Sequence, residues 1–435
     1  MARRFWVETL GCPKNQVDSD KLTGTLLAEG LEPAGDAGGA DLVVVNTCAF
    51  IEDARQESID TVLALADIRR DGAEVVVTGC MAERYGDELA AALPEVDAVA
   101  GFGRRLQSAP ASAVAVAIGA KPVWAGVGAG ETASVPDFDL LNLPRPASSV
   151  PWAYVKVAEG CDRACGFCAI PSFRGKQRSR SIDSILAEVD QLRVQEIVLV
   201  AQDLAAFGRD QGHGERQIVP LVQAVAEGVR RVRLLYLYPS DLTDMLIDAV
   251  CGTGVPYFDL SLQHVSPPLL RNMRRWGSGE RFLGRIADIR RREPAAAFRS
   301  NFIVGYPGET EEDHDQLLAF VEEAQLDWCG FFAYSREEGT YGAGLDGVVP
   351  GALREERLHE LRQRQDRITE LKRDELVGSR VEVLVDAPGT GRSHREAPEI
   401  DGVIVVPEHL QPGSFATVDI TGALGPDLIA AEVGR

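Results

Sequence analysis

Short hydrophobic runs alternate with amphipathic stretches through the first hundred residues of the chain. The runs read FWVETL, DLVVVN and EVVVTG, and each is followed by a stretch with helical periodicity, at 17–28, 51–70 and 82–92. Uninterrupted apolar runs of this length are typical of parallel strands that are buried on both faces. The pattern therefore predicts an α/β domain in which helices cover a parallel sheet.

A longer alternation of the same kind begins at Trp152. Helical patterns separate six apolar runs, which read AYVKVA, EIVLVA, RLLYLY, YFDLSL, FIVG and CGFFAY, and each run ends in polar or glycine-rich sequence. Six βα units of this size predict a partial or open TIM-like barrel. Since the active site of such a barrel lies at the carboxyl ends of its strands, the polar segments after the runs are candidate site residues.

The rest of the chain follows other patterns. Residues 351–376 predict a charged amphipathic helix, whose apolar stripe contains Leu358, Leu361, Ile368 and Leu371. Beyond this helix, four alternating runs separated by turn signals predict a small all-β barrel. A stretch rich in Gly, Ala, Ser and Pro between the two α/β parts predicts a linker, with a short hairpin around Trp124.

These patterns divide the chain of 435 residues into five parts. The predicted parts are an α/β domain at 1–105, a linker at 106–150, a barrel at 151–350, a connecting helix at 351–377 and a small all-β barrel at 378–435. A hydrophobic content of 45% and a charged content of 26% are ordinary for a globular protein. Because no apolar run is long enough for a signal peptide or a membrane span, we expect a cytoplasmic protein without a membrane partner.

Six of the eight cysteines fall into two sets of three. In the first set, Cys12, Cys48 and Cys80 each follow one of the three N-terminal apolar runs. The carboxyl ends of neighbouring parallel strands meet at one edge of a sheet, so we expect these thiols to converge. Three thiolates can hold a four-iron cluster and leave one iron open. The alternative is three structural cysteines that occupy equivalent positions by coincidence.

The second set is Cys161, Cys165 and Cys168, within AEGCDRACGFC, and no fourth cysteine follows nearby. Iron–sulfur clusters are usually held by four cysteines, so three would leave one iron free to bind a small molecule. The alternatives are a zinc clip or three buried thiols, but zinc fingers need a second ligand pair downstream. A basic run, SFRGKQRSR, follows the set and is predicted either to face an anionic ligand or to form a solvated loop.

The net charge of the chain is −21, which favours a basic partner over one bound through its phosphates. The predicted C-terminal barrel, 378–435, contains four Arg, no Lys and nine Asp or Glu. Such an acidic barrel should repel a nucleic-acid backbone and attract a basic protein.

The Cys-x-x-x-Cys-x-x-Cys spacing, with Phe167 beside the last cysteine, resembles the radical S-adenosylmethionine (SAM) enzymes. The position of the C-terminal barrel resembles that of a TRAM domain. Together with the three upstream cysteines, these features resemble the methylthiotransferase family over essentially the whole chain. The resemblance implies two four-iron four-sulfur clusters and SAM as cofactors, with the N-terminal α/β domain, the radical SAM barrel and the TRAM-like barrel in this order.

The resemblance also implies roles for individual residues. The set that contains Cys161 would hold the radical-generating cluster, and the set that contains Cys12 would hold a second cluster that carries the sulfur to be inserted. The residues implied in SAM binding are Phe167, Gln202, Asp203, Gln263 and Gly305. Two departures from the family pattern lie at the barrel mouth, namely Ser261 in place of a proline and the apolar stretch 204–207 in place of a more polar one.

Within the family, GCPKNQVDSD, NTCAFIEDARQESI, FIVGYPGETEED and YSREEGT resemble most the members that methylthiolate an aspartate of a small-subunit ribosomal protein. The implied partners are that protein or the ribosome, an electron donor such as flavodoxin or ferredoxin, and a sulfur source. One alternative is a methylthiotransferase that acts on a tRNA adenosine. Another is a non-catalytic iron–sulfur or zinc scaffold that only binds a ribosomal partner.

Overall fold

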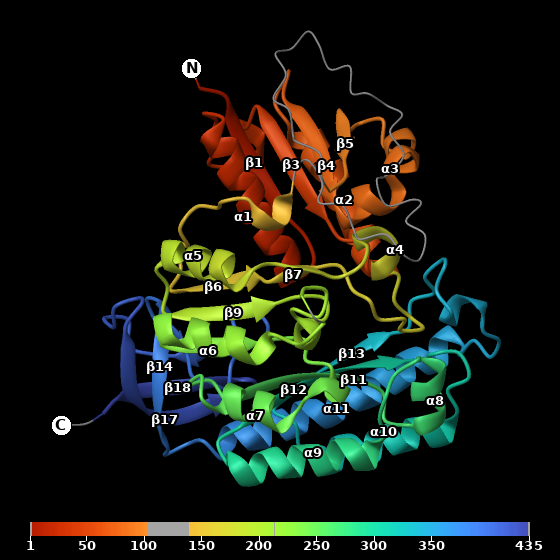
Figure 1. Cartoon of the computed structure of the whole chain (residues 1–435), viewed down its shortest axis with the longest axis vertical. Helices are drawn as coiled ribbons and strands as arrows, with labels where there is room; N and C mark the ends of the chain where they lie inside the picture. Colours follow the sequence, from red (N-terminus) through yellow and green to blue (C-terminus); the bar gives the residue numbers. More distant parts are fainter. Residues whose placement is uncertain (1, 103–138, 213, 434–435) are drawn as a thin grey trace.

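A computed structural model describes residues 2–102, 139–212 and 214–433 of the chain. Figure 1 shows an N-terminal α/β unit at one end, a second α/β unit below it, and a small β-barrel beside the strands of the second unit. The predicted hairpin around Trp124 and most of the predicted linker, 106–138, lie outside the described residues. Along the described ranges, no helix is both long and apolar enough to cross a membrane.

The N-terminal unit is a parallel five-stranded sheet in the order β2-β1-β3-β4-β5. Its strands are β1 (Arg4–Thr9), β2 (Glu32–Pro33), β3 (Leu42–Thr47), β4 (Glu74–Gly79) and β5 (Ala98–Ala100), and its helices are α1 (Pro13–Ala28), η1 (Ala37–Gly39), α2 (Glu52–Ile68) and α3 (Cys80–Ala92). Val44 packs with α1, whereas Val43 and Val45 pack with α2 and α3. Both faces of the sheet are therefore covered, as the uninterrupted apolar runs predict.

The second unit contains six parallel strands in two three-stranded sheets, β10-β9-β6 and β11-β12-β13, which an isolated parallel bridge between Leu237 and Leu260 connects. The strands are β6 (Trp152–Lys156), β9 (Glu196–Val200), β10 (Arg231–Leu234), β11 (Tyr257–Gln263), β12 (Ala297–Val304) and β13 (Trp328–Ala333). Together they form an open barrel, and the predicted α/β fold class is confirmed.

Helices and short elements connect these strands and cover the outside of the barrel (Figure 1). The helices are α4 (Ile170–Arg174), α5 (Ile182–Leu192), α6 (Ile218–Gly228), α7 (Asp244–Cys251), α8 (Pro267–Asn272), α9 (Gly279–Arg292) and α10 (Glu311–Ala324). The shorter elements are η2 (Leu140–Asn142), β7 (Ala158–Glu159), β8 (Arg178–Ser179), η3 (Leu204–Ala206), η4 (Pro239–Asp241) and η5 (Gly342–Gly344). Helix α4 packs against α3, since Phe173 belongs to the same buried cluster as Met81.

Helix α11 (Gly351–Asp374) packs against β13 and α10, and three of its four predicted apolar positions are buried. The prediction is wrong for Leu371, which is 55% exposed. The buried row continues instead through Gln365 and Thr369, whose side chains donate to the backbone oxygens of Leu326 and Asp327. Polar side chains can therefore extend a buried face that a hydrophobic pattern does not detect.

The C-terminal unit is a closed β-barrel in the order β14-β15-β16-β18-β17, which confirms the predicted small barrel. Its strands are β14 (Arg380–Ala387), β15 (Thr390–Arg392), β16 (Ile404–Val405), β17 (Phe415–Leu424) and β18 (Asp427–Glu432). The loop between β15 and β16 enters the amino-terminal end of the larger barrel. There Ala397 packs with Trp152 and Tyr257, and Asp401 accepts a hydrogen bond from Tyr257 at 2.6 Å. This loop closes the floor of the larger barrel, at the end opposite the carboxyl ends of its strands.

Candidate functional site

The structure places the three N-terminal cysteines at one edge of the first sheet. Cys12 lies between β1 and α1, Cys48 directly follows β3, and Cys80 begins α3 directly after β4. Since β1, β3 and β4 are neighbours in register, their carboxyl ends bring the three thiols to the same edge. Gly11 has a φ of +94°, and a side chain there would start 2.9 Å from the Cys48 sulfur, so glycine is required beside the set.

The thiols of this set affect one another electrostatically. Burial, and then the neighbouring Cys80 and Cys12, raise the pKa of Cys48 to about 12. Burial also raises the pKa of Cys80, although Arg174 acts in the opposite direction. Burial acts to raise the pKa of Cys12 as well, but Lys14 and Arg174 together lower it below its ordinary value. Burial therefore opposes ionisation of Cys48 and Cys80, whereas Lys14 and Arg174 favour the thiolate of Cys12.

The second cysteine set lies on the loop between β7 and α4, after the first strand of the barrel. The backbone N–H of Cys161 donates to the oxygen of Gly175 at 3.0 Å, and that of Cys168 donates to the oxygen of Cys165 at 3.2 Å. Burial raises the pKa of Cys161 and of Cys168 to about 12 in each case. The loop that carries the three thiols is thus held by backbone hydrogen bonds beyond the carboxyl end of β6.

The donor chemistry of both sets fits an iron–sulfur cluster. Each set offers three thiols and one guanidinium that donates to a sulfur: Arg174 to Cys80 at 3.0 Å, and Arg275 to Cys165 at 3.5 Å. Hydrogen bonds to the sulfurs are a common feature of protein-bound clusters. Within the described part of the chain, no three His, Cys, Asp or Glu side chains are grouped as a single metal ion requires. A four-iron cluster holds its thiolates farther apart than a single metal ion does. The absence of a single-ion site therefore does not conflict with a cluster.

Four of the residues implied in SAM binding follow barrel strands at their carboxyl ends. Gln202 and Asp203 follow β9, Gln263 ends β11, and Gly305 follows β12. The fifth, Phe167, packs beside Tyr306 and the other members of a small apolar cluster. The structure thus brings all five to the barrel end that carries the second cysteine set.

Three of these residues form hydrogen bonds with other residues of the chain. The Asp203 carboxylate accepts a hydrogen bond from Arg163 at 2.5 Å, and Gln202 donates to Glu159 at 3.1 Å. The backbone N–H of Gly305 donates to Glu309 at 2.5 Å. Asp203, which the resemblance implies in SAM binding, is thus paired with Arg163 in this structure.

The two departures from the family pattern have structural explanations. The stretch 204–207 forms η3 and the residue after it, and its side chains are buried in the main core of the barrel. The backbone N–H of Ser261, which a proline would lack, donates to the Leu237 oxygen at 2.9 Å, and the Ser261 backbone oxygen accepts from Arg275, the same side chain that donates to Cys165. The apolar stretch therefore supports the loop after β9 from behind, and Ser261 helps to hold a ligand of the second cysteine set.

Neither prediction for the basic run after the second cysteine set holds for its three arginines, whereas Lys176 is exposed. Arg178 pairs with Asp139 at 2.7 Å, and Arg180 pairs with Glu188 at 2.6 Å. Arg174 is buried as well, with a side chain that is 1% exposed. These three arginines therefore neither await an anionic ligand nor lie in a solvated loop, because carboxylates of the same chain pair with them.

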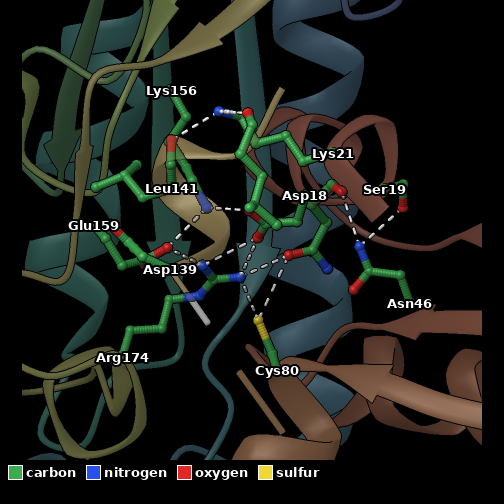
Figure 2. A network of polar contacts seen from close by, with 12 residues as sticks. Asp18, Ser19, Lys21, Asn46, Cys80, Asp139, Leu141, Lys156, Glu159 and Arg174 are labelled. Atoms are coloured by element: carbon green, nitrogen blue, oxygen red, sulfur yellow. Dashed lines mark hydrogen bonds and ion pairs between the residues drawn. The ribbon is translucent and has the colours of Figure 1, made fainter. Parts of the chain in front are cut away.

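A buried polar network that the sequence analysis missed runs from Cys80 of the first cysteine set to Glu159, two residues before Cys161 (Figure 2). Lys156, on β6, forms ion pairs with Asp18 of α1 and with Glu159, the latter at 2.7 Å. Arg174 donates to Glu159 at 2.9 Å and to Cys80 at 3.0 Å. The one available signal in the sequence is the lysine inside the apolar run AYVKVA, since lysine is almost never fully buried without a partner.

A second contact joins the N-terminal unit to the segment after β13. Glu337 accepts hydrogen bonds from Arg55 and Arg84, each at 2.6 Å, and the backbone N–H of Glu52 donates to Ser335 at 3.0 Å. A cavity of about 150 Å³ lies beside this contact, and Gly305 is among its lining residues. The segment YSREEGT is therefore part of the junction between the two α/β units.

Comparison with known proteins matches all three units. Residues 4–101 match the uncharacterized protein family UPF0004, residues 155–321 match the radical SAM superfamily, and residues 377–433 match the TRAM domain. Three similar relatives carry the name ribosomal protein uS12 methylthiotransferase RimO. The relative from Kineococcus radiotolerans is 41% identical over 100% of this chain and 98% of its own length. Those from Anaeromyxobacter sp. (strain K) and Moorella thermoacetica are 41% and 42% identical, over 100% and 96% of this chain and 94% and 96% of their own lengths.

Proposed function

The chain belongs to the RimO family of ribosomal protein uS12 methylthiotransferases, and from this membership we propose that it inserts sulfur and a methyl group at the β-carbon of an aspartate in that small-subunit protein. The structural observation that carries the proposal is the presence of two sets of three cysteines at the carboxyl ends of parallel strands, with one buried network that runs from Cys80 of the first set to Glu159, two residues before the second. A radical SAM enzyme needs a set such as Cys161, Cys165 and Cys168 to hold the cluster that binds SAM. The insertion of sulfur would require the other set, Cys12, Cys48 and Cys80.

The chemistry of the target carbon explains why cofactors are needed. Its hydrogen has no accessible pKa, so no general base of the chain can remove it. A four-iron cluster with one open iron supplies, when bound, the binding site for SAM and the electron that cleaves it. The protein contributes position and shielding. Cys161, Cys165 and Cys168 would hold that cluster, and Phe167, Gln202, Asp203, Gln263 and Gly305 would surround SAM.

We assign the second cluster to Cys12, Cys48 and Cys80. Support comes from their common sheet edge and from the position of this edge relative to the barrel. The Lys14 ammonium lies 3.6 Å from the ring centre of Tyr236, which follows β10 at the carboxyl end of the barrel. The loop that carries Cys12 therefore faces the barrel mouth, where a target aspartate could reach both cysteine sets. A second SAM would supply the methyl group by polar transfer.

The partners follow from charge and chemistry. The acidic C-terminal barrel suits a basic ribosomal protein, free or within the ribosome, better than an RNA backbone. An electron donor such as flavodoxin or ferredoxin and a separate sulfur source would complete the reaction, which we place in the cytoplasm.

The test is mass spectrometry of two candidate substrates. The protein is reconstituted anaerobically with iron, sulfide, reductant and SAM, and is then offered ribosomal protein uS12 and bulk tRNA separately. A methylthio increment on an aspartate of uS12 is the expected result. An increment on tRNA adenosine would refute uS12 as the substrate. If no deoxyadenosine is released with either substrate, the protein would instead be a non-catalytic scaffold that only binds its partner. The Cys161→Ala variant is the matched control without SAM cleavage.

A further inference from the structure

We propose that Arg174 is a positioning residue that bridges Cys80 to Glu159 and tunes the reduction potential of the cluster on Cys12, Cys48 and Cys80. The inference rests on the proposed function, because it assigns Arg174 a role toward that second cluster. Its basis is one guanidinium that donates both to a sulfur of one set and to the carboxylate that precedes the other set (Figure 2).

The two terminal nitrogens of the guanidinium both lie 3.4 Å from Asp18 Oδ2, and each has closer partners of its own. Nη2 donates to the Cys80 sulfur at 3.0 Å and to Asn15 Oδ1 at 2.8 Å, both in the N-terminal unit. Nη1 donates to Glu159 Oε1 at 2.9 Å, and Glu159 lies two residues before Cys161. The planar guanidinium therefore bridges Cys80 and Glu159, which a lysine ammonium could not do with the same geometry.

The position of Arg174 is itself fixed by packing. The residue before it, Phe173, is buried in the core of the N-terminal unit with Met81 of α3. Helix α4 therefore packs on the N-terminal unit, although in the sequence it directly follows the barrel loop that carries Cys161, Cys165 and Cys168. Any shift of one unit relative to the other would break the hydrogen bond to Cys80 or the pair with Glu159.

The charges of the network are balanced while Cys80 is protonated. Two cations, Lys156 and Arg174, face two carboxylates, Asp18 and Glu159. A thiolate at Cys80 adds a negative charge that Arg174 touches directly. A hydrogen-bond donor with a positive charge stabilises the more negative, reduced form of a cluster, and a nearby carboxylate destabilises it. Arg174 and Asp18 should therefore act on the potential with opposite signs.

The experiment measures this sign in the full-length chain. The variant C161A/C165A/C168A leaves the N-terminal set to bind iron alone, and the midpoint potential of its cluster is followed by electron paramagnetic resonance during a redox titration. Arg174→Gln in this background should shift the potential to more negative values, and Asp18→Asn should shift it to more positive values. Arg178→Gln is the matched control, because Arg178 belongs to the same basic run but pairs with Asp139.

The possible results separate this inference from the proposed function. A potential in Arg174→Gln equal to that of the Arg178→Gln control overturns the inference, and so do shifts of the same sign in Arg174→Gln and Asp18→Asn, which would indicate loosening alone. If Arg174→Gln loses its iron, Arg174→Lys keeps the charge and should show a smaller negative shift; an unchanged potential there refutes the role. Failure of the triple-alanine chain itself to bind iron would instead remove the second cluster and, with it, the proposed function.

Discussion

Replacing Glu196 with glutamine tests how the small β-barrel is held on the radical SAM unit. The Glu196 carboxylate is fully buried at the start of β9, where it accepts hydrogen bonds from Arg233 at 2.8 Å and from Arg392 of the small barrel at 3.1 Å. Burial acts to raise the pKa of Glu196, but Arg392 and Arg233 outweigh burial and lower the pKa from 4.5 to about 2. Glutamine preserves the shape of the side chain and removes its charge.

The lowered pKa gives the size of the expected effect. A fall from 4.5 to about 2 corresponds to about 3 kcal/mol of stability at neutral pH. Removal of one partner from a buried ion pair typically costs about 3 to 5 kcal/mol, which agrees. We therefore expect Glu196→Gln to lower the free energy of unfolding by about 3 kcal/mol at pH 7. Because the folded-state pKa is lowered, this contribution is present above the ordinary pKa and is lost as the pH falls from 4.5 toward 2.

The assay is urea unfolding of the full chain, followed by tryptophan fluorescence. Two tryptophans lie beside the docking surface: Trp328 donates to the Arg395 backbone oxygen at 2.8 Å, and the Trp152 ring centre lies 5.8 Å from the Arg392 guanidinium. The matched control is Asp419→Asn, because Asp419 forms an exposed pair with Arg380 that solvent screens, so its loss should lower the free energy of unfolding far less. If the two variants lose the same free energy of unfolding at pH 7, the Glu196 carboxylate does not hold the small barrel in the way inferred here.

Three further predictions concern the cysteine sets and α11. Cys161→Ala should abolish the release of deoxyadenosine from SAM, whereas Cys48→Ala should keep this release and lose methylthiolation. Chromatography measures the deoxyadenosine, and mass spectrometry measures the methylthiolated product. Methylthiolated product from a Cys48 variant without the second cluster would contradict the two-cluster assignment. Gly160→Ala sets a Cβ 2.1 Å from a backbone oxygen at a φ of +75°, so iron bound per chain should fall, and a full iron content would show that the loop tolerates a side chain. Leu361→Ala, at a fully buried position, should cost about 2 to 5 kcal/mol in urea unfolding, whereas Leu371→Ala should cost about 0.5 kcal/mol or less; equal costs would contradict the observed burial.

The apolar runs of the sequence correctly predict the strands, because a strand buried on both faces needs an uninterrupted run such as DLVVVN. The placement of Cys48 and Cys80 follows from the same pattern, since each directly follows such a run. Strand β15 could not be predicted, because three residues, Thr390–Arg392, carry no periodicity. It exists only because its neighbours β14 and β16 pair with it.

Buried charges limited the prediction of the site. Arg174 and Arg180 looked like exposed or ligand-binding residues, because their partners Glu159 and Glu188 lie in other elements of the fold. The pairing of distant residues is set by tertiary packing, which local composition does not encode. The misplacement of Leu371 has the same origin, since packing against β13 and α10 selects which row of α11 is buried.

The loop that carries Ala397 and Asp401 makes the C-terminal barrel part of the larger barrel rather than an appendage. Asp401 pairs with Arg299 of β12 at 2.5 Å, inside the floor that this loop closes. Deleting the C-terminal unit would therefore admit water to the barrel interior and expose buried charges, and would not yield an enzyme that merely lacks a docking surface. Truncation and domain exchange thus cannot measure partner recognition in this fold. Charge reversal on the outer surface of the small barrel can.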